Sequence, residues 1–277
     1  MQRYNLTIEN IFFNSKIANH LFCQSTFALS HCFTNMKHSI LIFLFFCLLQ
    51  TMLEAGPPFY TDDPEPVEYR HWEYYISTID LKHDNLITGT LPHFEVNYGL
   101  IENVQVHLIL PLNFNYVNSQ SFQYGYASTE IGIKYRFIQE NGRIPQIGTF
   151  PIVEMPTINN SNFNNGKAQV YLPVWLQKSW DKLTTYGGVG YWINPGTGNK
   201  NWFFAGWEAQ YDFSKYFTFG SEFYYHSSET NIDQSSIGFN AGGFINLNEN
   251  LHFLFSFGHS IFNQSFFSSY LGLQWTI

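Results

Sequence analysis

The sequence predicts an all-β fold, because polar and apolar side chains alternate almost without a break from about residue 70 to the carboxyl terminus. The alternating runs number twelve, and they are joined in turn by tight turns and by longer polar loops. Aromatic residues make up 19% of the chain and charged residues only 12%, against about 25% charged in a soluble domain. These three observations predict a transmembrane antiparallel up-and-down β-barrel of about 12 strands, a fold that pairs every strand edge.

The predicted strands are runs of alternating side chains bounded by Gly, Pro, Asn, Asp and Ser. Val104, Val106 and Leu108, for example, alternate with Gln105 and His107. Each run reaches the roughly 9–11 residues that a tilted strand needs to cross a bilayer. The twelve strands cover residues 71–81, 87–98, 104–117, 124–138, 144–156, 167–180, 183–194, 201–213, 217–229, 235–247, 251–261 and 266–277.

The connections fall into two sets, as they do in barrels whose two ends face different compartments. Tight turns are expected at 99–103, 139–143, 181–182, 214–216 and 248–250. Longer polar loops are expected at 82–86, 118–123, 157–166, 195–200 and around 230–234. A secreted β-sandwich also alternates apolar and polar faces and is the alternative fold. Aromatic residues at predicted strand ends favour the membrane barrel, since interfacial girdles lie there; they are Trp72, Tyr98, Tyr116, Tyr135, Trp180, Tyr211, Phe213 and Phe217.

The last predicted strand places Leu271, Leu273, Trp275 and Ile277 on alternate positions up to the carboxyl end. This pattern resembles the C-terminal signal of outer-membrane barrels, with Ile277 where that signal favours Phe. The resemblance implies insertion by the barrel-assembly machinery, with outer-membrane lipid as the surrounding partner and the bacterial outer membrane as the location.

The amino-terminal part is expected to be removed. Residues 39–53 carry no charge, and Lys37 precedes them, so residues 36–55 predict a secretory signal peptide cut after Ala55. Residues 1–35 are then an upstream extension before the true start at Met36; the alternative is a genuine N-terminal domain with a membrane anchor. The three cysteines are at positions 23, 32 and 47, so the exported chain would have none.

Residues 56–70 are expected to form an extended periplasmic lead-in to a barrel at 71–277, because their prolines cannot pair in a sheet. A solvated acidic tether is favoured here over a Ca²⁺ site at Asp62, Asp63, Glu65 and Glu68. The stretch 56–75 (GPPFYTDDPEPVEYRHWEYY) resembles the opening of the MetA-pathway of phenol degradation family of outer-membrane β-barrel transporters. That resemblance implies transport of small molecules.

If the apolar face meets lipid, the other face lines the lumen and carries most of the charge. The lumen-lining candidates are Glu95, His107, Glu130, Lys134, Arg136, Glu208, Asp212 and Glu222. Carboxyl groups outnumber Lys and Arg there, which indicates either a pathway that prefers cations and neutral solutes or a paired network that fills a narrow barrel. The net charge is −8, so the chain lacks the basic surface that nucleic-acid binding needs.

The sequence therefore predicts a passive transporter or channel for small molecules, hydrophobic or aromatic ones if the family resemblance holds. A structural or surface-interaction barrel with a blocked lumen is the alternative, and an outer-membrane lipid hydrolase is the less favoured one. In the pairs His226–Ser227 and His259–Ser260 the side chains point to opposite faces, so only a cross-strand Ser–His pair leaves an enzyme open. No cofactor, metal site or catalytic residue is expected.

Overall fold

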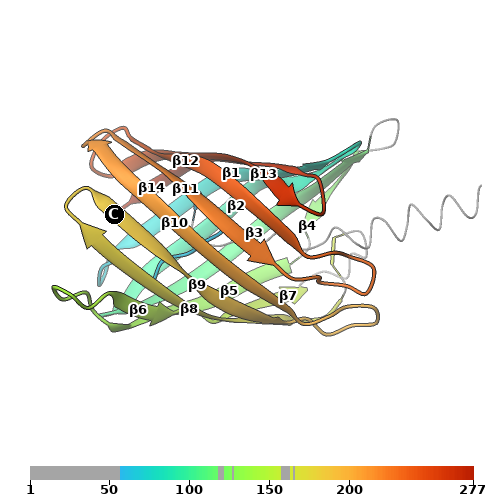
Figure 1. Ribbon diagram of the computed structural model, residues 1–277, viewed down its shortest axis with the longest axis horizontal. Coiled ribbons are helices and arrows are strands. Elements are labelled where there is room, and N and C mark those ends of the chain that lie inside the picture. The colour runs from blue at the N-terminus through green and yellow to red at the C-terminus, as the bar shows by residue number, and fades with distance from the viewer. Residues whose placement is uncertain (1–56, 118–121, 127, 157–162, 165) are drawn as a thin grey trace, which may run out of the picture. The chain divides into compact units, whose positions relative to one another are not determined.

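The structure is a computed structural model that describes residues 57–117, 122–126, 128–156, 163–164 and 166–277. These residues form a closed antiparallel β-barrel of 12 strands, which confirms the predicted fold class (Figure 1). Two of the twelve consist of two segments each, so the element numbering reaches 14 within the described ranges. The elements are β1 (Trp72–His83), β2 (Leu86–Ile101), β3 (Val104–Val117), β4 (Gln123–Tyr126), β5 (Ser128–Ile138), β6 (Gln146–Thr149), β7 (Ile152–Pro156), β8 (Gln169–Trp180), β9 (Leu183–Ile193), β10 (Trp202–Ser214), β11 (Phe217–His226), β12 (Ser236–Asn246), β13 (Leu251–Phe262) and β14 (Phe267–Thr276).

The sheet closes between its first and last strands. β1 pairs antiparallel with β14 from Glu73 opposite Thr276 to Lys82 opposite Phe267. Beyond that register, the backbone N–H of Trp72 donates to the carbonyl of Ile277 at 2.8 Å, and Ile277 donates back at 2.9 Å. A single closed sheet excludes the two-layered sandwich that the alternation alone had left open.

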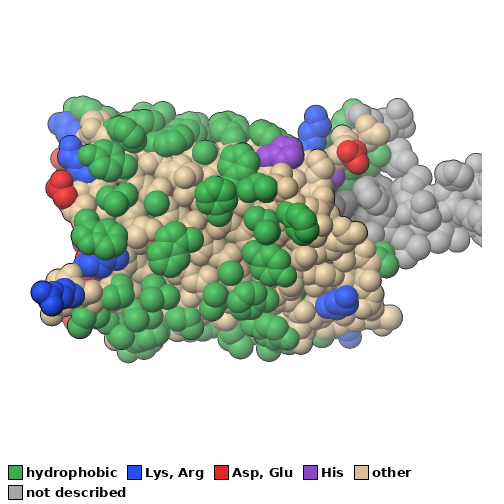
Figure 2. Space-filling view, in the orientation of Figure 1, with side chains coloured by type: hydrophobic (Ala, Val, Ile, Leu, Met, Phe, Trp, Pro, Cys, Tyr) green, Lys and Arg blue, Asp and Glu red, His purple; other side chains and the backbone are tan. Residues whose placement is uncertain are grey.

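The strand alternation places apolar side chains outside and polar ones inside. On β5 the side chain of Ile133 is 51% exposed, whereas its neighbour Lys134 is 6% exposed. Figure 2 shows hydrophobic side chains over the side of the barrel and most Lys and Arg near its ends. The low charge and high aromatic content of the sequence follow from this inverted arrangement, which is typical of a barrel whose outer face meets lipid.

The two ends of the barrel differ in their connections. One end, the short-turn end, carries the turns after β2, β5, β8, β10 and β12 together with residues 71 and 277. The other end, the long-loop end, carries the connections after β1, β3, β7, β9, β11 and β13. The part of the chain that the structure describes contains no helix long and apolar enough to span a bilayer.

The N-terminal segment, Pro57–Arg70, lies inside the barrel. It enters at the short-turn end, where Tyr69 bridges to Gly99, and it reaches the middle of the lumen at Pro58, whose carbonyl accepts a hydrogen bond from Ser256 Oγ. Phe59 and Asp62 are buried. The expectation of a solvated acidic tether is wrong for Asp62, which is buried against Lys134 on the barrel wall, whereas Glu65 and Glu68 are exposed. The predicted signal peptide at 36–55 and the extension at 1–35 lie outside the described residues.

Candidate functional site in the barrel lumen

The lumen has a polar half toward the short-turn end, and three of the predicted residues form a hydrogen-bonded chain there. Asn97 Nδ2 donates to Glu95 Oε1 at 2.7 Å, and His107 Nδ1 lies 2.6 Å from Asn97 Oδ1. The other nitrogen of His107 lies 2.9 Å from Glu130 Oε1. All four side chains are buried and come from β2, β3 and β5. The chain of partners fixes the His107 ring between two carboxyl groups.

Lys134 is the buried cation of the polar half. Its ammonium donates to Asp62 Oδ1 at 3.0 Å and lies 3.6 Å from Asp63 Oδ1. The side chains of Lys134 and Asp62 are 7% and 2% exposed. A buried ammonium requires such a partner, since an isolated charge is costly to remove from water. The pair therefore fastens the N-terminal segment to β5.

Glu222 on β11 holds the same segment through its backbone. Its two carboxylate oxygens accept the backbone N–H groups of Tyr60 and Thr61 at 2.8 and 2.7 Å, and Asn240 Nδ2 donates to it at 2.6 Å. Glu208 stands opposite Glu222 in the register of β10 and β11 and is 0% exposed. Neither carboxyl oxygen of Glu208 has a hydrogen-bond partner within the described ranges.

The remaining two predicted residues lie nearer the rim. Arg136 is partly buried, and its guanidinium donates to Asn103 Oδ1 and Gln146 Oε1, with Glu65 3.6 Å away. Asp212 is exposed near the short-turn end and accepts from Thr218 Oγ1. The structure thus buries six of the eight candidates and leaves Asp212 at the rim. Their part in a solute pathway stays a prediction.

A cavity of about 490 Å³ lies in the polar half. It extends inward from the short-turn end, since Ser179 and Thr184 beside the β8–β9 turn line it together with the deeper Ile109 and Phe150. Its acidic lining is formed by Asp62, Asp63, Glu65, Glu68, Glu73 and Glu95. Against these acidic residues, the described part of the cavity lining contains a single Lys or Arg side chain, that of Lys134. The cavity is therefore acidic and favours cationic or neutral occupants.

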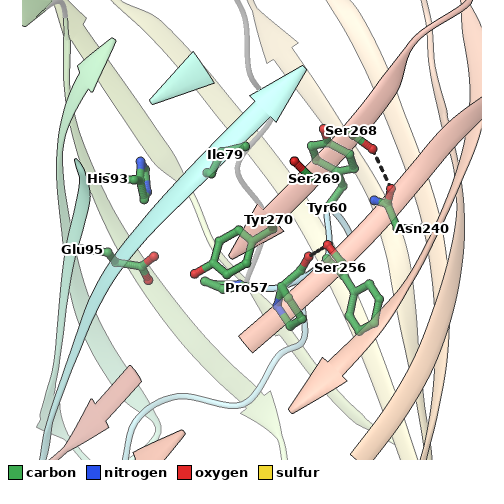
Figure 3. Close-up of a pocket in the computed structure, with 12 residues that line it drawn as sticks. Pro57, Tyr60, Ile79, His93, Glu95, Asn240, Ser256, Ser268, Ser269 and Tyr270 are labelled. Carbon is green, nitrogen blue, oxygen red and sulfur yellow. Dashed lines mark hydrogen bonds between the residues drawn. The ribbon is translucent and has the colours of Figure 1, made fainter. Parts of the chain in front are cut away.

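A second, water-sized cavity of about 30 Å³ lies beside Pro57 and Pro58 of the N-terminal segment (Figure 3). Figure 3 shows Glu95 and His93 on one side of it and Ser256, Ser268 and Asn240 on the other. Ser268 Oγ donates to Asn240 Oδ1 at 2.8 Å. Pro57 and Glu95 line both cavities, which therefore adjoin each other.

The lumen toward the long-loop end is an aromatic half. Tyr171, Trp192 and Trp202 stack in a row across β8, β9 and β10, with ring centroids 4.8 and 5.5 Å apart and planes within 17° of parallel. The buried cluster around this row consists of Phe150, Ile152, Tyr171, Trp175, Trp192, Trp202, Phe204, Tyr224 and Phe266. Tyr60 of the N-terminal segment packs against Tyr224, with ring centroids 4.8 Å apart. Aromatic packing and the segment together fill this part of the lumen.

The loops after β9 and β11 pack on each other at the long-loop end. The backbone N–H of Lys200 donates to the carbonyl of Glu229 at 2.8 Å, and Asn231 donates to Gly198 at 2.9 Å. Burial raises the pKa of the Glu229 carboxyl well above its ordinary value, and nearby Asp233 raises it further. This loop pair lies at the same end of the barrel as the aromatic half.

Sequence reasoning missed three features of the lumen. The N-terminal segment has no regular alternation of polar and apolar residues that would place it in the barrel. The aromatic row could be found in part, because Trp192 and Trp202 are inward positions of two neighbouring predicted strands. The pair formed by Ser236 and His226 spans two strands, as described below, and the register of β11 and β12 was needed to find it. Within the described residues, no group of three or more His, Cys, Asp or Glu side chains has a metal-binding arrangement.

The fold resembles solved outer-membrane proteins, although no protein-family profile and no curated protein sequence matches the chain. One is the COG4313 outer membrane channel from Pseudomonas putida F1, with a TM-score of 0.61, 12% identity and coverage of 81% of this chain and 100% of that one. Another is the NanC porin, with a TM-score of 0.52, 10% identity and coverage of 73% and 98%. The resemblance of residues 56–75 to the MetA-pathway family stays a prediction. The chain has the barrel fold of these outer-membrane channels.

Proposed function

We propose that this protein is a passive transporter in the bacterial outer membrane for small hydrophobic or aromatic molecules. The observation that carries the proposal is the interior of the barrel, which combines a cavity of about 490 Å³ with an aromatic half instead of being packed throughout. Ligand sites are commonly apolar cavities with a few placed polar groups. The rings of Tyr75, Phe150 and Tyr186 line the cavity and offer such a surface to an aromatic solute.

The N-terminal segment gives the transporter a closed state. Lys134 and Glu222 hold the segment in the lumen through the contacts described above. A solute can pass only when these contacts or the aromatic packing rearrange. We therefore expect a small, intermittent conductance and slow, selective uptake instead of the steady flow of an open porin.

The test is uptake by liposomes that contain the refolded barrel. We expect entry of a small phenolic solute to exceed entry of a sugar of similar size, and we expect brief conductance events in planar bilayers. Liposomes with the heat-unfolded protein are the control. Absence of both conductance and uptake would overturn the transporter and leave the blocked structural barrel, for which the filled lumen is the supporting observation.

The carboxyl-terminal strand supports insertion by the barrel-assembly machinery. On β14 the side chains of Leu271, Leu273 and Trp275 all point outward, and all three are exposed. Deletion of residues 275–277 should remove the signal and the closing bonds to Trp72. We expect the truncated chain to accumulate unassembled in the periplasm, as measured by fractionation of cells. Normal assembly of the truncated chain would contradict this role.

A further inference from the structure

Ser236 and His226 face each other across the first rung of the β11–β12 hairpin. His226 is the last residue of β11, Ser236 is the first residue of β12, and the two are register partners. Ser236 Oγ lies 2.6 Å from His226 Nε2. Cross-strand partners point to the same face of a sheet, unlike the sequence neighbours His226 and Ser227. The structure therefore supplies the cross-strand pair that sequence reasoning left open.

The second nitrogen of His226 sets the direction of this hydrogen bond. Nδ1 lies 3.3 Å from the carbonyl oxygen of Ser227, which can only accept. Nδ1 therefore carries the proton, and the lone pair of Nε2 accepts from the Ser236 hydroxyl. Glu229 Oε1 is 3.9 Å from Nδ1, beyond hydrogen-bond distance. A serine that donates to a histidine oriented through its other nitrogen is the arrangement that activates a hydroxyl nucleophile.

An unused donor lies beside the pair. The ring of Trp202 packs edge-on against His226 with centroids 6.3 Å apart. Its indole N–H is buried and has no acceptor in the part of the chain described, and the same holds for Trp192, on which it stacks. Buried N–H groups without a partner are uncommon in native proteins. A carbonyl oxygen of a bound molecule is the acceptor that such a donor lacks, and the stacked rings form an apolar wall for the rest of that molecule.

We propose that Ser236 is a nucleophile, activated by His226, that cleaves carboxylic esters with an apolar or aromatic acyl group inside the long-loop end of the lumen. Ser236 Oγ attacks the carbonyl carbon while His226 Nε2 takes the hydroxyl proton. His226 then gives this proton to the alcohol oxygen as the ester C–O bond breaks, which leaves the acyl group on Ser236. A water molecule repeats the same steps and releases the acid, so the reaction needs no further reactant.

Access to Ser236 requires movement of the loops above it. Ser236 is 0% exposed and directly follows the loop of residues 227–235 at the long-loop end. Two backbone hydrogen bonds link this loop to the loop after β9, from Lys200 to Glu229 and from Asn231 to Gly198. Their opening would admit an ester from the long-loop end. The inward position of Ser236 points to esters within the barrel and not to lipids of the surrounding bilayer.

The test is labelling of the refolded full-length barrel with a fluorophosphonate, followed by intact mass and peptide mapping. We expect a single adduct on Ser236, no adduct in Ser236→Ala, and labelling at least about 100-fold slower in His226→Asn, the loss typical of a missing general base. Ser77→Ala is the matched control. Ser77 is also an inward register partner of a histidine, His93, but its hydroxyl has no hydrogen-bond partner among the described residues.

Several outcomes would overturn the proposal. These are absence of an adduct on the folded barrel, an adduct elsewhere than Ser236, or equal labelling of wild type and His226→Asn. Heat-dependent gel migration reports whether each variant folds. If His226→Asn fails to fold, His226→Gln and the mapped site of the wild-type adduct decide. The rate of p-nitrophenyl butyrate hydrolysis should fall from wild type to His226→Asn and Ser236→Ala, as the labelling rate does. This assay does not depend on uptake, so failure of transport and failure of this proposal remain distinguishable.

Discussion

The polar half and the aromatic half of the lumen are held together in different ways. In the polar half, oxygens and nitrogens meet specific partners, as in the contacts of Lys134 with Asp62 and of Glu222 with Tyr60 and Thr61. In the aromatic half, rings pack by shape, and the polar atoms of Tyr171 and Trp192 have no partner within the described ranges. The stability of the first half depends on hydrogen bonds and ion pairs, and that of the second depends on how well the rings fit together. Mutations in the two halves should therefore change the stability of the barrel in different ways.

The N-terminal segment joins the two halves. Its Asp62 belongs to the polar network, and its Tyr60 packs on Tyr224 of the aromatic cluster. A change in either half therefore reaches the same segment. The variants below remove one kind of contact at a time and measure the free energy of unfolding of the refolded barrel in urea.

The largest loss is expected for Lys134→Met. The substitution leaves the carboxyl of Asp62 buried without its cation, which costs about 3–5 kcal/mol when one partner of a buried pair is removed. The double variant Asp62→Asn with Lys134→Met should recover much of the loss, since both charges are then absent. If Lys134→Met and the wild-type protein unfolded at the same urea concentration, the ion pair would not hold the segment.

Glu222→Ala should cost about 2–4 kcal/mol, because it leaves the buried N–H group of Thr61 without an acceptor, at about 1–3 kcal/mol, and the part-buried N–H group of Tyr60, at about 1 kcal/mol. It should also loosen the segment, so that planar-bilayer conductance rises. Glu222→Gln, which keeps one acceptor oxygen, is the matched variant and should lose about half as much. Equal conductance of all three proteins would show that the segment is not anchored through this residue.

The barrel could be predicted from the sequence because lipid enforces the alternation that the prediction used. The prediction was less exact where a strand is interrupted. Residues 144–156 were expected to form one strand, but Pro151 has no N–H for the ladder, and the strand divides between Thr149 and Ile152. The strand predicted at 217–229 ends at His226, because the next residues form a loop at the long-loop end.

The site could be predicted only in part, since inward positions follow from the alternation but partners do not. The alternation of polar and apolar side chains along each strand predicted that Glu222 and Lys134 lie on the inner face. Their partners lie in the N-terminal segment, with Thr61 separated by 161 residues from Glu222 and Asp62 by 72 from Lys134. That segment is rich in proline and has no period, so nothing local indicates that it turns back into the lumen.

A moderate effect is expected for Gly190→Ala in the aromatic half. A Cβ at Gly190 would lie 2.2 Å from the ring of Tyr171, so the ring would have to shift and the stack with Trp192 would loosen. Overpacking of this kind costs about 1–3 kcal/mol. Addition of Tyr171→Leu, which makes room for the methyl group, should reduce the loss. If it does not, crowding of the ring is not the cause.

The smallest effect is expected for Tyr171→Phe, and it compares the two halves directly. The Tyr171 hydroxyl is buried without a partner among the described residues, so its removal should change stability by less than about 1 kcal/mol, in the stabilising direction. Tyr75→Phe removes the same atom in the polar half, where the hydroxyl donates to Glu73 Oε2 at 2.7 Å. A hydrogen bond to a carboxyl group contributes about 1.5–3 kcal/mol, so this variant should be destabilised. Equal losses for the two variants would mean that pairing, and not shape, holds both halves.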